Sequence, residues 1–233
     1  MSDFPRSTAT PASWAPDSTA VFSQRAEVTR VLRNTYALLS MTLIFSALVA
    51  AATVAFQLPA PGMILTLVGY FGLLFAIHKT QNSGAAVPLV FALTGFMGYT
   101  LGPLLNAVLA LPGGASTIAL ALGLTGVSFL ALSAYALSSK KDFSFMGGFL
   151  MAGMVVALLA GLAAFFFKIP ALAMVVSGVV ALLSMGMMLF ETSRIVNGGE
   201  RNYVMATVSL YVSIYNLFTS LLSLLGFAGS SED

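Results

Sequence analysis

The chain has 233 residues, of which 58% are hydrophobic and only 8% are Asp, Glu, Lys or Arg, and its formal net charge is +2. A soluble domain carries about a quarter of its residues as charged side chains, so this composition excludes a water-facing surface and indicates a membrane protein. The absence of Cys and the presence of a single His exclude disulfides, thiolate metal sites and cysteine nucleophiles, and leave little for histidine chemistry.

The N-terminal segment, residues 1–17, is rich in Ser, Thr, Ala and Pro. It cannot bury enough apolar surface to fold alone, and we predict a disordered tail. A helix is expected to begin at Ser18, with Asp17 or Ser18 as its cap, and its apolar positions favour a short amphipathic helix on the membrane surface.

Seven stretches free of Asp, Glu, Lys and Arg follow, and crossing a bilayer as a helix requires about 20 such residues. They cover residues 36–56, 63–77, 85–111, 118–137, 145–167, 171–190 and 204–227. The first is longer and starts later than the apolar region of a signal peptide, which disfavours that alternative. The second is short, and Pro59, Pro61 and Gly62 interrupt its start, but the charge distribution requires it.

With seven spans, the basic residues fall almost entirely on one side of the membrane. Nine of the ten lie on that side, and only Lys168 lies on the other; the nine are Arg6, Arg25, Arg30, Arg33, Lys79, Lys140, Lys141, Arg194 and Arg201. The positive-inside rule then predicts a cytoplasmic N-terminus and a periplasmic C-terminus. We accordingly expect a cytoplasmic tail with its short helix at residues 1–30, a seven-helix transmembrane domain at 31–229 and a short tail at 230–233.

No ionisable residue lies in the middle of any span. This disfavours retinal proteins, proton-coupled transporters and intramembrane proteases, all of which need such residues. No nucleophile with its base, metal-ligand set or phosphate-binding loop can be assembled, so we expect no enzymatic activity, no catalytic residue, no metal and no cofactor. The scattered basic residues form no stripe, which excludes a nucleic-acid partner.

The last span carries a line of polar residues. We define the polar stripe as Ser209, Ser213, Asn216, Ser220 and Ser223, whose spacings of 4, 3, 4 and 3 place them on one helix face. Either these side chains hydrogen-bond to neighbouring helices, or the last helix is central and the stripe lines a solvated path. Asn216 is the strongest member because its amide offers two donors and an acceptor.

Glu191 directly follows the sixth apolar stretch, and Arg194 lies three residues later. One interpretation is an interfacial carboxylate paired with Arg194, or with Arg33, Arg201 or Lys79 across the cytoplasmic mouth. The other is a gate or sensor carboxylate. The run 197–199, Asn-Gly-Gly, is expected to end this helix.

Glycines in the third span indicate close helix packing. Gly95, Gly98 and Gly102 lie at i, i+3 and i+7, which favours a tight contact with a neighbouring helix. Pro103 follows them and is expected to kink or break the helix there.

Five segments together resemble the Bax inhibitor-1 superfamily and, within it, the bacterial modulators of the FtsH protease. They are VLRNTYALLS, LPAPGMILTLVGYFGLLF, TGFMGYTLGPLLN, SAYALSSKKDFSFMGGFLMAGM and LFETSRIVNGGERNYVMATVSLYVSIYNLF, so the resemblance runs from about residue 31 to the end. It implies a bundle of six helices around a central seventh, which agrees with the polar stripe.

Members of the superfamily are associated with calcium leak, and some bacterial relatives are described as pH-sensitive calcium leaks whose sensor is a pair of Asp residues. Glu191 matches the first position, but Ser213, in the segment Leu210-Tyr211-Val212-Ser213, stands at the second. A Glu opposite a Ser lacks the like-charge coupling that makes a carboxylate pair share a proton, which argues against a pH-gated calcium mechanism in this chain.

Resemblance to the FtsH modulators implies an inner-membrane protein that binds a membrane-bound AAA protease and slows its action on other membrane proteins. This is the function that we expect, with the bilayer and the protease as partners. The alternative is a leak for calcium or other cations along the polar stripe, with a cytoplasmic gate at Glu191.

Overall fold

The computed structural model describes residues 18–139 and 141–229. The predicted disordered tail at 1–17 and the C-terminal tail at 230–233 lie outside the described residues.

The described chain is all-helical. Its elements are α1 (Ser18–Ala55), α2 (Met63–Thr80), α3 (Ala86–Leu109), α4 (Gly114–Ser139), the short 3-10 helix η1 (Ser144–Met146), α5 (Gly147–Phe167), α6 (Pro170–Val196) and α7 (Tyr203–Gly229). All seven α-helices contain segments long and apolar enough to cross a membrane. The prediction of seven transmembrane helices, including the short second one, is therefore confirmed.

Two helices extend well beyond their apolar stretches. The helix expected from Ser18 forms the first turns of α1 and continues without a break to Ala55, so it is not a separate element. Later in the chain, α6 continues past its apolar stretch to Val196. Glu191 therefore lies inside a helix, more than one turn before the helix ends at the predicted Asn-Gly-Gly run.

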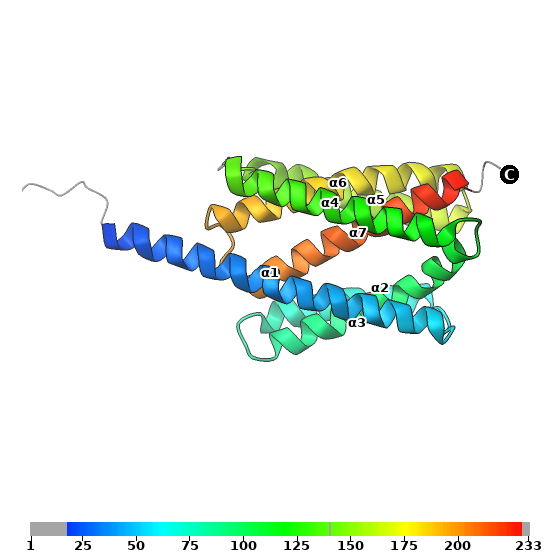
Figure 1. Ribbon diagram of the computed structural model, residues 1–233, viewed down its shortest axis with the longest axis horizontal. Helices are drawn as coiled ribbons and strands as arrows, with labels where there is room; N and C mark the ends of the chain where they lie inside the picture. The colour runs from blue at the N-terminus through cyan, green and yellow to red at the C-terminus, as the bar shows by residue number, and fades with distance from the viewer. Residues whose placement is uncertain (1–17, 140, 230–233) are drawn as a thin grey trace, which may run out of the picture.

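The helices form two layers with α7 between them (Figure 1). One layer contains α1, α2 and α3, and the other contains α4, α5 and α6. The last helix packs against α1, α3, α4 and α6, whereas α2 lies against α3 and α5 lies against α6. Half of the α7 span is buried, a larger share than in any other span, so α7 forms the centre of the described bundle.

The outer helices α2 and α5 carry large apolar side chains that are exposed in the bundle. On α2 these are Ile64, Leu65, Val68, Phe71 and Phe75, and on α5 they include Phe149, Met151, Val155, Val156, Leu159, Phe165 and Phe166. Such surfaces are stable in lipid, whose acyl chains are as apolar as these side chains.

The glycines of α3 lie against α1. A Cβ atom at Gly95 would lie 2.8 Å from the Phe45 ring, and one at Gly98 would overlap the backbone carbonyl oxygen of Ser46. At Gly102 it would overlap the side chain of Thr53. At Gly98 the two helix backbones approach too closely for any side chain, whereas at Gly95 and Gly102 a larger residue would displace the Phe45 or Thr53 side chain.

Of the kink or break expected at Pro103, the break does not occur. The helix α3 continues from Ala86 through Pro103 to Leu109. Transmembrane helices tolerate proline because neighbouring helices and local adjustments satisfy the backbone groups that it releases.

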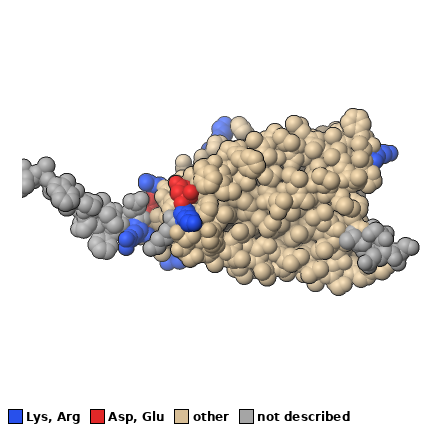
Figure 2. All heavy atoms as spheres, turned by 90° about the horizontal axis from the view of Figure 1, so that it is seen from above, with Lys and Arg blue, Asp and Glu red and all other residues tan. Residues whose placement is uncertain are grey.

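Charged side chains gather at one end of the molecule, the end from which α1 protrudes, and a basic group lies at the opposite end (Figure 2). The faces between these ends are almost free of charge in this view, as expected for a surface that contacts the hydrocarbon core of a bilayer.

Candidate functional site

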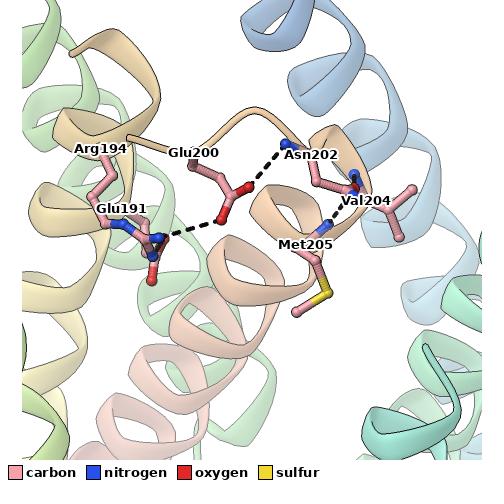
Figure 3. Close-up of polar contacts among 6 residues, drawn as sticks. All are labelled: Glu191, Arg194, Glu200, Asn202, Val204 and Met205. Carbon is pink, nitrogen blue, oxygen red and sulfur yellow. Dashed lines mark hydrogen bonds and ion pairs between the residues drawn. The ribbon is translucent and has the colours of Figure 1, made fainter. Parts of the chain in front are cut away.

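Glu191 is buried near the end of α6, with only 4% of its surface exposed. One turn later, the Arg194 guanidinium lies 3.5 Å from its carboxylate through Nη1, and 3.4 Å from the Glu200 carboxylate through Nη2 (Figure 3). Arg194 also lies over the Phe190 ring, 5.4 Å from the ring centroid. A single guanidinium therefore lies between two carboxylates, one from α6 and one from the α6–α7 loop.

Glu200 connects this ion pair to the start of α7. Its Oε1 accepts a hydrogen bond from the backbone N–H of Asn202 at 2.9 Å. The Asn202 side chain accepts from the N–H groups of Val204 (2.9 Å) and Met205 (3.3 Å), and so caps α7 (Figure 3). We call Glu191, Arg194, Glu200 and Asn202 the α6–α7 cluster.

The same cap contacts the loop between α2 and α3. The Asn202 Nδ2 donates to the carbonyl of Gln81 and to the side-chain oxygen of Asn82, both at 3.1 Å. The start of the central helix is therefore fixed to the first layer of the bundle.

The end of α6 contacts the loop between α4 and α5 in a similar way. The Ser193 hydroxyl donates to the carbonyl of Lys141 at 3.0 Å and accepts from the N–H of Phe143 at 3.1 Å. Asn197, one turn later, donates to the Ser193 hydroxyl at 3.1 Å. The α6–α7 connection thus contacts the loops of both layers at the charged end.

The polar stripe makes no hydrogen bond to another helix within the described residues. Ser213, only 2% exposed, donates to the Ser209 carbonyl at 3.0 Å, and Ser223 donates to the Thr219 carbonyl at 2.8 Å, both within α7. In the same part of the chain, no hydrogen bond reaches the Asn216 amide, and none joins Glu191 to Ser213.

The interhelical hydrogen bonds of α7 come from other residues. The Tyr211 hydroxyl lies 2.7 Å from that of Ser46 in α1 and donates to the Thr94 carbonyl in α3 at 3.3 Å. The Tyr215 hydroxyl lies 2.9 Å from that of Thr100 in α3. Thr207, four residues before Tyr211, donates to the Thr35 carbonyl in α1 at 3.3 Å.

This second face of α7 was not predicted from the sequence, although Thr207, Tyr211 and Tyr215 follow one another at a spacing of four residues that indicates a shared helix face. At about 100° per residue, this face lies roughly opposite the polar stripe. The face that carries Tyr211 and Tyr215 contacts α1 and α3. The polar stripe, on the opposite face, therefore lies on the side of α7 where α4 and α6 pack.

Helices α4 and α6 also carry buried hydroxyls that lack a hydrogen-bond partner within the described residues. They are Ser133 and Ser139 in α4, and Ser184 and Thr192 in α6; Thr35 and Tyr36 in α1 carry two more such hydroxyls. A buried hydroxyl without a partner is unfavourable, whereas a few water molecules or ions would satisfy it. Together with Glu191 and the polar stripe, the α4 and α6 hydroxyls make the region between α4, α6 and α7 rich in polar groups.

No group of three or more His, Asp or Glu side chains able to hold a metal ion occurs in the described ranges. The described residues thus offer an ion-paired cluster at the charged end and buried polar groups between α4, α6 and α7.

Comparison with known proteins decides the family. Residues 28–230 match the family described as "Inhibitor of apoptosis-promoting Bax1". This chain belongs to the Bax inhibitor-1 family.

Three of its relatives are bacterial proteins. The chain is 55% identical over 199 residues to "Modulator of FtsH protease YccA" of Escherichia coli K12. The matched stretch covers 85% of this chain and 90% of that protein. The identity and coverage are the same for "Inner membrane protein YccA" of E. coli O6:H1. An uncharacterized protein of Pseudomonas aeruginosa is 51% identical over 215 residues, covering 92% and 96% of the two chains.

These relationships, with the seven apolar helices, identify a multi-pass protein of the bacterial inner membrane. Likeness to a protein named as a modulator also supports the prediction that the chain is not an enzyme. The resemblance that the sequence motifs indicated is confirmed.

Proposed function

We propose that this protein binds a membrane-bound AAA protease of the FtsH type and slows its action on other membrane proteins. The observation that carries the proposal is the 55% identity over 90% of the length of a protein named as an FtsH modulator. The matched stretch is 199 residues long, so the identity is not confined to one motif.

The packing of the bundle supports a role as a poor substrate that occupies the protease. An AAA protease must extract a membrane protein before degrading it. The α1–α3 contact at Gly98 and Gly102 and the hydrogen bonds of Tyr211 and Tyr215 oppose the separation of α1, α3 and α7. Residues 1–17, on the expected cytoplasmic side, are the segment that we propose the protease grips.

Capture by a proteolytically inactive FtsH-type protease in lipid nanodiscs tests binding directly. We expect the full-length protein to be captured and a variant lacking residues 1–17 to be captured more weakly. A variant in which those residues are replaced by a Gly/Ser segment of equal length is the matched control for tail length. Unchanged capture of the deletion variant would contradict the role of the tail, and absent capture of the full-length protein would contradict the proposal.

We also propose that the N-terminus is cytoplasmic and the C-terminus periplasmic. The support is the sequence distribution of basic residues, nine on one side and Lys168 on the other, together with the gathering of charge at one end (Figure 2). Alkaline phosphatase fused after residue 233 should be active, whereas the same enzyme fused in the loop at Asn82 should be inactive. The reverse pattern would overturn this orientation.

A cation leak is a second candidate function, favoured by the buried hydroxyls of Ser133, Ser184 and Thr192 that lack partners on the same side as the polar stripe. Calcium and potassium flux into liposomes, measured from pH 5 to pH 8, tests it. Flux that Glu191→Gln alters would support the leak. A silent parent, with Ser213→Asp gaining pH-dependent flux, would indicate a pathway without its sensor and leave protease modulation as the function.

A further inference from the structure

The protruding start of α1 carries three arginines that the proposed function does not use. Arg25, Arg30 and Arg33 are all exposed, and together with Ala26 and Thr29 they form one open stretch of the helix surface. We call these three residues the α1 arginine patch. Their positions, at about 100° per residue, place them within a little under half of the helix circumference.

None of these guanidinium groups has a carboxylate partner within the described residues, where both ion pairs belong to Arg194. Glu27 lies three residues before Arg30 but makes no ion pair with it. Three unpaired guanidinium groups on one helix face form a site for an anion with several acceptor oxygens, since guanidinium groups bind phosphate in a bidentate manner.

The depth of the patch identifies the source of that anion. Thr35 in α1 accepts a hydrogen bond from Thr207 in α7, five residues after Asn202 caps that helix. At about 1.5 Å per residue, Arg33 and Arg30 therefore lie near the level at which α7 begins, and Arg25 lies roughly 10 Å farther out. The polar headgroup layer is about 5–8 Å thick on each side of the hydrocarbon core.

We propose that the α1 arginine patch binds the phosphate headgroup of an anionic phospholipid, of the phosphatidylglycerol class, in the cytoplasmic leaflet. Arg30 and Arg33 contact the headgroup phosphate, and Arg25, farther out from the membrane, adds electrostatic attraction. The site does not depend on protease modulation, but its place in the cytoplasmic leaflet rests on the proposed orientation of the N-terminus.

Titration of short-chain phosphatidylglycerol into the full-length protein, held in a neutral detergent, tests the proposal. Binding is measured by the change in melting temperature and by native mass spectrometry, with short-chain phosphatidylcholine and sodium phosphate as separate ligands. We expect phosphatidylglycerol to bind more tightly than either. Equal binding of the two lipids would overturn the proposal, and phosphate binding as tight as that of phosphatidylglycerol would indicate a site for free anions instead.

Three variants separate this site from general charge. The triple variant Arg25→Gln, Arg30→Gln and Arg33→Gln should bind phosphatidylglycerol at least about tenfold more weakly, since each basic residue near an anionic surface contributes roughly fivefold. The corresponding triple Lys variant should bind more weakly than the parent but more tightly than the Gln variant, because it keeps the charge and loses the bidentate guanidinium contacts.

The matched control, Lys79→Gln, Lys141→Gln and Arg201→Gln, removes the same charge from exposed positions at the same end of the bundle. It should change binding little. An equal loss in this control would show a nonspecific charge effect and contradict the site. Binding of an acidic peptide in preference to the lipid would contradict it in favour of a protein partner.

Discussion

The hydroxyl of Tyr211, in α7, lies 2.7 Å from the hydroxyl of Ser46, in α1. Tyr211 also donates to the Thr94 carbonyl in α3, so the Ser46 hydroxyl is the donor in the first contact. One buried side chain thus joins the central helix to two helices of the first layer. Ser46 also lies against Gly98 of α3, where a Cβ atom would overlap its carbonyl oxygen.

The variant Tyr211→Phe keeps the ring and removes both hydrogen bonds, and it leaves the Ser46 hydroxyl buried without its acceptor. We expect the free energy of unfolding to fall by about 1–2 kcal/mol. Steric trapping in lipid bicelles would measure it. Tyr135→Phe is the control, because Tyr135 is 46% exposed on α4 and none of the hydrogen bonds between described residues involves its hydroxyl. An equal loss in both variants would contradict the role of Tyr211.

Substitution of the α3 glycines should separate α3 from α1. Gly98→Ala and Gly102→Ala each place a methyl group against the backbone of Ser46 or the side chain of Thr53, and we expect each to lower the free energy of unfolding by about 1–3 kcal/mol. Gly123→Ala in α4 is the matched control, because a Cβ there meets no atom within 4 Å. It should be neutral or slightly stabilising. Tolerance of alanine at Gly98 would be inconsistent with the close contact.

Removal of Arg194 should leave two carboxylates without their shared cation. Arg194→Gln is expected to lower the free energy of unfolding by about 1–3 kcal/mol, less than for a fully buried pair because 32% of the Arg194 side chain is exposed. The double variant Glu191→Gln, Arg194→Gln should lose less than the sum of the single variants. Strict additivity would mean that the pair contributes no coupling. Arg201→Gln, at an exposed position, serves as the control.

The loop before α5 provides a test of pH dependence outside the membrane. The side-chain hydroxyl and the backbone N–H of Ser144 donate to the exposed Asp142 carboxylate and lower its pKa below the ordinary range. Because the folded-state pKa is lowered, the stabilisation is present above the ordinary pKa of Asp and disappears as the pH falls through the folded value. Ser144→Ala should raise the pKa of Asp142 in a carboxyl-carbon NMR titration. An unchanged midpoint would contradict this local hydrogen bonding.

The number and positions of the spans could be predicted because apolar length is a property of each segment alone. Even the short second span could be predicted, because Lys79 lies on the same side as the other basic residues only if that span crosses the membrane. The packing role of Gly95, Gly98 and Gly102 was also visible, since their spacing places them on one face.

The contacts at the charged end could not be predicted because they join residues far apart in the chain. Ser193 and Lys141, or Asn202 and Gln81, have no spacing that relates them. The continuity of α3 through Pro103 depends on neighbouring helices, which a local rule about proline does not include. The interhelical role of Tyr211 was missed because the polar stripe, on the opposite face of the same helix, has the more conspicuous pattern.

The central claim is that the protein slows an FtsH-type protease. The most direct measurement is the rate at which the purified protease degrades a membrane substrate in proteoliposomes, with this protein added at increasing ratios. We predict that the rate falls and then levels off while this protein remains intact. A rate that does not change at any ratio, or that falls equally with an unrelated seven-helix protein, would contradict the claim.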